Sequence, residues 1–266
     1  MKLKNKVILV TASTRGIGLA ITKAFAKEGA LVYMAARNLE LANKEADKLN
    51  SEGYSVKCVY NDATKYESYI SMTDEVIKDA GHIDVLVNNF GTSNPEKDLD
   101  FSDTDAEVFF EIVNINLRSV FMASKEVAKQ MAKNGGGSII NISSVGGIVP
   151  DISQVAYGTS KAAINYLTKL IAVHEAKNNI RCNAILPGMT ATDAVEKNLT
   201  ENFKEMFMRH IPFKRMATPE EIAAAAVYFA SDDSLYTTGQ ILAISGGFGL
   251  ATPLYGDLSD KKYRRS

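Results

Sequence analysis

The chain has 266 residues, of which 46% are hydrophobic and 23% charged, and its formal net charge is −1. This composition is typical of a globular protein with a substantial core, and the balanced charge gives no indication of nucleic-acid binding. Residues 1–6 are basic, but the apolar run 7–10 that follows is too short for a signal peptide or a membrane span. We therefore expect a cytoplasmic protein that binds neither membranes nor nucleic acid.

Cys58 and Cys182 are the two cysteines of the chain, and each lies in an apolar run typical of a β-strand. This placement favours buried free thiols over a disulfide. Neither has a second cysteine at metal-ligand spacing, and the chain has only three histidines. We therefore expect no metal site.

Seven short apolar runs alternate with amphipathic patterns of helical period. The runs are residues 7–10, 31–35, 56–60, 85–87, 138–142, 181–185 and 241–244. They are apolar on both faces, as buried parallel strands are. The alternation predicts an α/β fold over residues 1–266: one doubly wound, Rossmann-type domain whose parallel seven-stranded sheet has helices on both faces.

Three polar or irregular segments interrupt this alternation, each after the carboxyl end of a predicted strand. They are residues 90–105, 143–155 and 187–212. Open α/β sheets bind their ligands at these ends. We expect about 188–212, which is rich in Met and Phe, to form a mobile, partly helical substrate lid. About 250–266 should form a C-terminal tail with a basic, solvated end.

A glycine-rich turn follows the first predicted strand and opens the first predicted helix. It reads Thr11-Ala12-Ser13-Thr14-Arg15-Gly16-Ile17-Gly18. Gly16 and Gly18 allow close approach of the backbone, and a helix N-terminus offers free N–H groups and the positive end of its dipole to a pyrophosphate. We predict that residues 13–18 bind a dinucleotide. The alternative is a tight turn that binds no ligand.

The end of the second predicted strand distinguishes the two nicotinamide dinucleotides. NAD sites usually carry a carboxylate there for the ribose 2′-hydroxyl, whereas this chain has Ala35-Ala36-Arg37. The planar fork of Arg37 suits a 2′-phosphate, and Arg15 could approach the same group. We therefore predict NADP(H) rather than NAD(H). The alternative for Arg37 is a surface charge paired with Glu40.

Polar residues also end the third and fourth predicted strands. Asp62 and Ala63 could border the adenine, with Asp62 accepting from its amino group. Asn89 and Gly91 follow the fourth strand, where a glycine gives backbone access beside the cofactor. For the neighbouring Asn88, a turn in which the side chain bonds its own backbone is nearly as well supported.

Tyr157 and Lys161 are four residues apart, a spacing that places both on one face of a helix. A phenol has an unperturbed pKa of about 10, and a neighbouring ammonium group lowers that pKa because it favours the phenolate. Such a phenol can exchange a proton with a hydroxyl or carbonyl group, while a nicotinamide carries the hydride. The alternative is a surface tyrosine packed on a lysine stem.

In this order the motifs resemble those of the classical short-chain dehydrogenase/reductase family over essentially the whole chain. The glycine turn resembles the family's Thr-Gly-x-x-x-Gly-x-Gly pattern. Asn88-Asn89-Phe90-Gly91 resembles Asn-Asn-Ala-Gly. The family's segment that holds the nicotinamide and the phosphates has a similar counterpart here in Pro187, Gly188, Thr190 and Thr192.

The resemblance implies an NADP(H)-dependent oxidoreductase with four catalytic residues. Tyr157 would be the general acid/base, and Lys161 would lower its pKa and hold the ribose hydroxyls of the cofactor. Ser144, thirteen residues before Tyr157, would stabilise negative charge on the substrate oxygen, with Ser143 as the neighbouring alternative. Asn116 would position a water that links Lys161 to solvent, or alternatively bend its helix.

Three positions depart from the family pattern. Ala12 replaces the first glycine of the turn, and we expect the turn to persist because a methyl group is small. Phe90 replaces Ala and could press on the cofactor or shape the substrate pocket. Ser245 stands where many members carry Asp, with no evident consequence for the chemistry.

Within the family, the resemblance is greatest to bacterial NADP-dependent 7α-hydroxysteroid dehydrogenases of bile acids. It includes the non-catalytic residues 149–153, 179–184 and 249–253. It implies interconversion of a hydroxyl and a ketone on a bile acid or other steroid, in a long apolar pocket. Candidate walls of that pocket are Ile148, Val149, Met189, Phe207 and Tyr255.

Other interpretations stay open from the sequence. The same chemistry could act on position 3 or 12 of a steroid, on a 3-oxoacyl thioester or on a polyol. A non-catalytic NADP-sensing protein is a more distant alternative. The family resemblance also implies a homotetramer, in which the Tyr157 helix and a helix over 106–133 form one dimer face and the last strand forms another.

Overall fold

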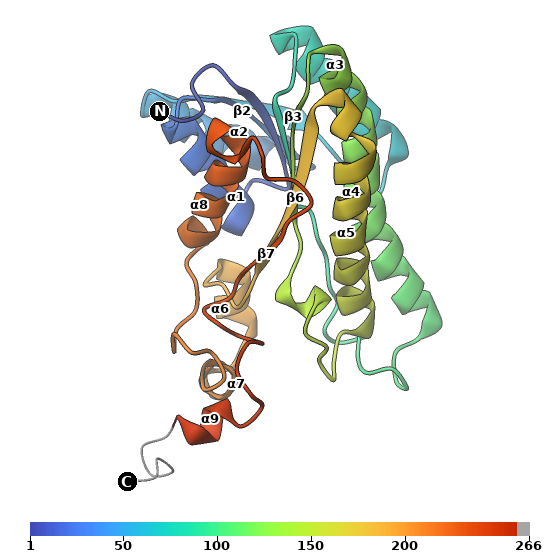
Figure 1. The fold of residues 1–266 in the computed structure, drawn as a ribbon, viewed down its shortest axis with the longest axis vertical. Helices are drawn as coiled ribbons and strands as arrows, with labels where there is room; N and C mark the ends of the chain where they lie inside the picture. Colours follow the sequence, from blue (N-terminus) through green and yellow to red (C-terminus); the bar gives the residue numbers. More distant parts are fainter. Residues whose placement is uncertain (260–266) are drawn as a thin grey trace.

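The structure is a computed structural model that describes residues 1–259, apart from the side chains of residues 194 and 198. Seven parallel strands form one sheet in the order β3-β2-β1-β4-β5-β6-β7 (Figure 1). The strands are β1 (Val7–Thr11), β2 (Leu31–Ala36), β3 (Ser55–Tyr60), β4 (Val85–Asn88), β5 (Gly137–Ile142), β6 (Ile180–Pro187) and β7 (Ile241–Ile244). The predicted fold class is confirmed.

Helices cover both faces of the sheet (Figure 1). One face carries α1 (Gly16–Lys27), α2 (Leu39–Ser51) and α8 (Pro219–Ala230), and the other carries α3 (Tyr66–Ala80), α4 (Ala106–Lys133) and α5 (Val155–His174). Successive residues of β1 enter different cores: Ile8 packs on the α1 side and Leu9 on the α4 side. The inner strands are mostly apolar and buried along their length because both of their faces are covered.

The two edge strands do not follow this pattern. In β3, Lys57 is exposed and Cys58 is only half-buried, and in β7 Leu242 is 38% exposed. The prediction of strands buried on both faces is therefore wrong at the edges, where a strand has a neighbour on one side only. Cys182 is buried as predicted, and both cysteines are free thiols.

The segment after β6 lies beyond the carboxyl ends of the strands and contains two short helices, α6 (Asp193–Asn198) and α7 (Glu201–Met208) (Figure 1). Phe207 of α7 stacks on Phe248, with ring centroids 4.7 Å apart. Arg209 pairs with Asp257 at 3.2 Å, so the expected lid contacts α9 (Tyr255–Leu258) of the C-terminal tail. The basic end at 261–265 lies outside the described residues.

A series of hydrogen-bonded, buried polar side chains connects β4 and β5 near their carboxyl ends. The Asn88 amide of β4 donates to Ser124 Oγ at 2.9 Å and to Asn141 Oδ1 at 2.8 Å. The Asn141 amide of β5 donates to Thr168 Oγ1 of α5 at 2.9 Å. Asn88 therefore joins two strands and two helices instead of bonding its own backbone in a turn.

The remaining short elements are 3₁₀ turns: η1 (Val145–Gly147), η2 (Ala176–Asn178) and η3 (Asp232–Ser234). Within residues 1–259, no helix combines the length and hydropathy that a membrane span requires.

Candidate active site

Tyr157 and Lys161 meet Ser144 beyond the carboxyl ends of β4 and β5. The two α5 side chains lie on one face, with Lys161 Nζ 5.5 Å from the centroid of the Tyr157 ring. Lys161 is 3% exposed and donates to the Ile142 carbonyl at 3.1 Å. The Ser144 side chain is hydrogen-bonded to Tyr157 and accepts from the Gly146 N–H of η1 at 3.1 Å.

Burial controls the protonation of this pair. It raises the pKa of Tyr157 above its ordinary value, and the hydrogen bond with Ser144 opposes only part of that rise. Burial also lowers the pKa of Lys161 to about 8. The expected lowering of the Tyr157 pKa by Lys161 is therefore wrong in this structure, because enclosure disfavours the charged form of both groups.

The two serine candidates have different surroundings. Ser143 is buried, and its hydroxyl donates to the Lys161 carbonyl at 3.2 Å, which joins β5 to α5. Ser144 is the serine hydrogen-bonded to the Tyr157 side chain. The geometry therefore agrees with the preference for Ser144 drawn from its spacing to Tyr157.

The side chain of Asn116 is fully buried in α4 and is engaged by protein groups. Its Oδ1 accepts from the Thr92 N–H at 2.9 Å, and its amide donates to the Thr92 carbonyl at 2.9 Å and to Ser160 Oγ at 3.0 Å. Both amide hydrogens are thus occupied. Asn116 holds the segment that follows β4 against α5, a contact that sequence reasoning missed.

The glycine turn predicted to bind a dinucleotide connects β1 to α1, and we call it the glycine cradle. A Cβ atom on Gly18 would lie 2.6 Å from the Ala12 carbonyl oxygen, so a side chain there would fill the turn. Arg15 precedes α1 and provides no side-chain cap, so the first N–H groups of the helix are available to an anion. Ala12 keeps the turn, as expected, but at a left-handed φ of +51°.

Other predicted cofactor residues are closely packed against neighbouring segments. A Cβ atom on Gly16 would lie 3.4 Å from Thr192 Cγ2, which places the start of the lid beside the cradle. A Cβ atom on Gly91 would lie 3.0 Å from Lys161 Nζ, and one on Gly188 would lie 2.8 Å from Ser245 Cα. The close packing gives Ser245 a structural role that the sequence did not indicate.

The residues predicted to distinguish NADP(H) from NAD(H) lie near the ends of neighbouring strands. Arg37 directly follows β2 and Arg15 follows β1, and both are exposed. Asp62 follows β3, where Arg37 contributes to lowering its carboxyl pKa after the larger effect of hydrogen bonds from Thr64. The Ala63 carbonyl accepts from Arg118 at 3.3 Å. The adenosine of the cofactor is thus expected near two guanidinium groups, those of Arg15 and Arg37, and near the Asp62 carboxylate.

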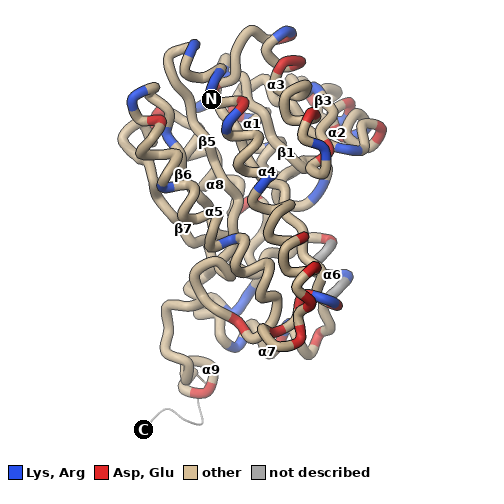
Figure 2. The backbone as a smooth tube through the Cα atoms, turned by 90° about the vertical axis from the view of Figure 1, so that its right-hand side faces the viewer, with Lys and Arg blue, Asp and Glu red and all other residues tan. Residues whose placement is uncertain are grey.

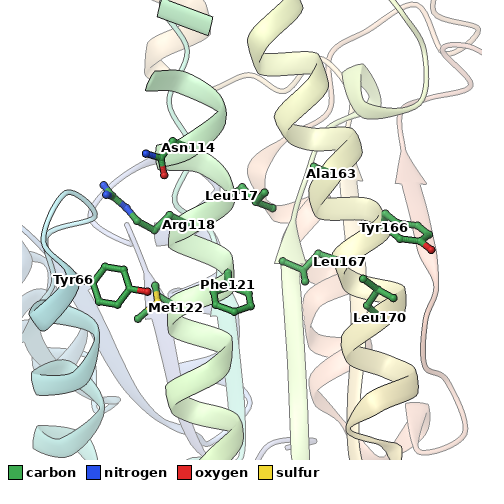
Figure 3. A pocket seen from close by; sticks show the side chains of 10 residues that line it. All are labelled: Tyr66, Asn114, Leu117, Arg118, Phe121, Met122, Ala163, Tyr166, Leu167 and Leu170. Atoms are coloured by element: carbon green, nitrogen blue, oxygen red, sulfur yellow. The ribbon is translucent and has the colours of Figure 1, made fainter. Parts of the chain in front are cut away.

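The candidate pocket walls have different surroundings. Ile148 is 52% exposed, and Val149 packs against Gly249. Tyr255 packs under Lys214, whose Nζ lies 4.9 Å from the ring centroid. A groove of about 540 Å³ lies elsewhere, between the outward faces of α4 and α5, where Leu117 and Leu167 point into it (Figure 3).

A family model described as enoyl-(acyl carrier protein) reductase matches residues 11–249. Two curated relatives carry the name 7alpha-hydroxysteroid dehydrogenase. The protein from Paraclostridium sordellii is 49% identical over 98% of this chain and 98% of its own, and that from Clostridium sardiniense is 48% identical over 96% and 98%. The chain belongs to the short-chain dehydrogenase/reductase family.

A solved short-chain dehydrogenase/reductase structure has the same fold. It is described as 7 alpha-hydroxysteroid dehydrogenase complexed with NADH and 7-oxo glycochenodeoxycholic acid, and it superimposes with a TM-score of 0.88 at 33% identity, over 93% of this chain and 95% of that chain. Short-chain dehydrogenases/reductases use a nicotinamide cofactor, which agrees with the glycine cradle. That relative was solved with NADH. The preference of this chain for NADP(H) or NAD(H) is therefore inferred from its own residues.

Proposed function

We propose that this chain is an NADP(H)-dependent oxidoreductase that interconverts a secondary hydroxyl group and a ketone on a steroid, with the 7α-hydroxyl of bile acids as its substrate position. The observation that carries the chemistry is the cluster of partly buried Tyr157 and Ser144 with buried Lys161. The steroid assignment is supported by the relatives named 7alpha-hydroxysteroid dehydrogenase.

The cofactor would bind across the strand ends. When bound, the nicotinamide supplies the hydride acceptor or donor. The turn residues Ser13–Gly18 would hold the pyrophosphate, and Arg15 and Arg37 the 2′-phosphate of NADP(H). The other contacts would come from Asp62, Ala63, Asn89, Gly91, Tyr157, Lys161, Pro187, Gly188, Thr190 and Thr192. The missing side chains at Gly18 and Gly91 fit this proposal, because a Cβ atom on Gly18 would crowd the glycine turn and one on Gly91 would lie 3.0 Å from Lys161 Nζ.

Tyr157 would exchange the proton at the substrate oxygen. Since burial raises its pKa, Tyr157 keeps its proton near neutral pH and is suited to donate it to a ketone. Ser144 would donate a hydrogen bond to the same oxygen and stabilise the developing negative charge. Lys161 would hold ribose hydroxyls and relay the proton, with Asn116 fixing the segment around it. Alcohol oxidation, which needs the phenolate, should be favoured by alkaline pH.

A large apolar substrate fits the surroundings of the site better than an acyl-carrier protein does. The lid helices α6 and α7 carry four acidic residues and two basic ones, and Figure 2 colours the acidic positions red and the basic ones blue along the tube. These are Asp193, Glu196, Glu201, Glu205, Lys197 and Lys204. An acidic carrier domain would be repelled by this segment. Stacked Phe203, Phe207 and Phe248 instead offer apolar surface beside the site.

Three alternatives keep the same fold. The chemistry could act at steroid position 3 or 12, or on a 3-oxoacyl thioester or polyol. A non-catalytic NADP-sensing protein would not need Tyr157, Lys161 and Ser144 assembled in one cluster.

The proposal includes a homotetramer in which the groove of α4 and α5 faces a second copy. Its apolar lining includes Leu117, Phe121 and Leu167 (Figure 3), and Phe121 is 46% exposed. Light scattering should give four subunit masses for the wild type and a smaller assembly for Leu167→Glu. One subunit mass for the wild type would reject the proposal.

The deciding experiment is NADP⁺ reduction by bile acids that differ only in which of carbons 3, 7 and 12 carries a hydroxyl group. The proposal predicts turnover with the 7α-hydroxyl compounds and none when that hydroxyl is missing or is 7β. Turnover that follows the 3- or 12-hydroxyl would move the position, and turnover only with acyl thioesters or polyols would overturn the steroid assignment.

A further inference from the structure

The N-terminus of α5 is capped by residues that come far earlier in the chain. The main-chain N–H groups of residues 154–157 precede the first hydrogen bond inside the helix, from Gly158 to Gln154. The carbonyl of Asp98 accepts from Gln154 and the carbonyl of Leu99 accepts from Val155, each at 3.1 Å. The Asp98 carboxylate accepts hydrogen bonds from the next two N–H groups. Its Oδ1 accepts from the Ala156 N–H at 2.8 Å, and its Oδ2 accepts from the Tyr157 N–H at 2.9 Å.

This arrangement replaces a local cap. Gln154 occupies the N-cap position with a left-handed φ of 58°, and its side chain makes no capping hydrogen bond. Asp98 is 0% exposed. Its carboxylate is stabilised there by two charge-assisted hydrogen bonds and by the positive end of the helix dipole. The two residues are linked in space although 58 positions separate Asp98 from Ala156.

The segment 91–98, which ends at Asp98, also contacts two other proposed catalytic residues, Lys161 and Asn116. Gly91 lies against Lys161, at 3.0 Å from Nζ for a Cβ atom placed on it, and Thr92 is bonded at both main-chain atoms to Asn116. Six residues later, Asp98 holds the main-chain N–H of Tyr157 itself. The segment 91–98 therefore spans from the lysine and asparagine to the tyrosine.

We infer that Asp98 is a positioning residue for the reaction: its two carboxylate oxygens set the place of the Tyr157 main chain, and through it the place of the phenol, relative to Lys161 and Ser144. The inference rests on the proposed role of Tyr157 as general acid/base. Asp98 does not reach the substrate and acts only through α5. A displacement of about 1 Å at a reacting group can cost about a hundredfold in rate, so loss of this cap should appear in kcat.

The test is Asp98→Asn in the full chain, with steady-state kinetics and NADPH binding. The amide replaces one acceptor oxygen by a donor that faces a main-chain N–H, so one of the two hydrogen bonds is lost. We expect kcat to fall about tenfold to a hundredfold, with the KM of the steroid and the Kd of NADPH within about twofold of the wild type. Asp100→Asn is the matched control, because Asp100 also accepts two N–H groups, from Ser102 and Asp103, but in an exposed turn; its kcat should be unchanged.

Asp98→Ser, which keeps one acceptor oxygen without adding an amide, should show the same loss confined to kcat. A folded variant of either kind with wild-type kcat overturns the inference. So does a parallel rise of KM and Kd, or failure of both variants to fold, since Asp98 would then support the fold and not the tyrosine. If Tyr157→Phe keeps wild-type turnover, the proposed function itself fails; if Tyr157→Phe is inactive and Asp98→Asn is normal, only this inference fails.

Discussion

Lys161 Nζ lies 5.5 Å from the centroid of the Tyr157 ring, and Lys161 is buried while Tyr157 is partly buried. Enclosure acts on the two groups in opposite directions: it holds the proton on the phenol and loosens the proton on the ammonium group. In the proposed mechanism this pair would pass a proton toward the substrate oxygen, helped by the lowered pKa of Lys161.

Tyr157→Phe removes the hydroxyl and leaves the ring and its packing. We expect kcat to fall by about a hundredfold to ten-thousandfold, the usual contribution of a general acid or base, while NADPH binding by fluorescence is retained. Tyr166→Phe is the matched control on the same helix, because Tyr166 is 66% exposed. Near-normal turnover of Tyr157→Phe would remove the central claim.

The lowered pKa of Lys161 predicts a pH dependence of stability. A lysine in the unfolded chain has a pKa of about 10.4, against about 8 in the folded protein, so the unfolded state binds more protons between these values. The free energy of unfolding should rise with pH in that window, with Lys161 contributing about 2 kcal/mol between about pH 8 and pH 9.5. Urea unfolding at several pH values measures this.

Lys161→Met should lack this contribution, whereas Lys169→Met, at an exposed position of the same helix, should keep it. Identical pH dependence in the wild type and Lys161→Met would show that the lysine is not enclosed as described.

Arg37→Ala tests the cofactor preference. Loss of a charge-assisted contact with the 2′-phosphate should lower kcat/KM for NADP⁺ by about tenfold to a hundredfold, at about 1.5–3 kcal/mol per contact, and leave kcat/KM for NAD⁺ nearly unchanged. Arg215→Ala, at an arginine that pairs with Glu221 at 2.6 Å, is the control. Wild-type preference for NAD⁺ would contradict the prediction.

Ala12→Gly should stabilise the protein. Ala12 has a φ of +51°, where an L-residue pays about 1–2 kcal/mol, and glycine relieves this strain at an entropic cost of about 0.4–1 kcal/mol. We expect a gain of about 0.5–1 kcal/mol in urea unfolding. Ala20→Gly, in the interior of α1, should instead lose about 1 kcal/mol. Destabilisation by Ala12→Gly would show that the turn is not strained at this residue.

The sequence predicted the elements whose signals are local. The helix expected over 106–133 has those bounds, because Asp105 caps its first turn by accepting from the Glu107 N–H at 2.7 Å and glycines follow its end. The inner strands agree within two residues of their predicted ends, since an apolar run bounded by polar residues leaves few alternatives.

What the sequence did not reveal depends on distant contacts. The cap of α5 by Asp98 and the attachment of Thr92 to Asn116 join segments that no periodicity relates. The direction of the Tyr157 pKa shift depends on how deeply the folded chain encloses the phenol. The spacing to Lys161 identified the partners, but it carried no information about their burial.

The amide pair of Asn88 and Asn141 has a consequence for how the sheet assembles. The two residues are opposite each other in the pairing of β4 with β5, among Val, Leu and Ile residues that could pack in neighbouring alignments. A slip of one residue would turn Asn141 to the other face of the sheet and leave amide groups without partners, at about 1–3 kcal/mol for each. The pair thus favours the observed alignment of β4 and β5, the strands that precede Gly91 and Ser144. The relative position of these two site residues is therefore set by the same hydrogen bond that fixes the strand register.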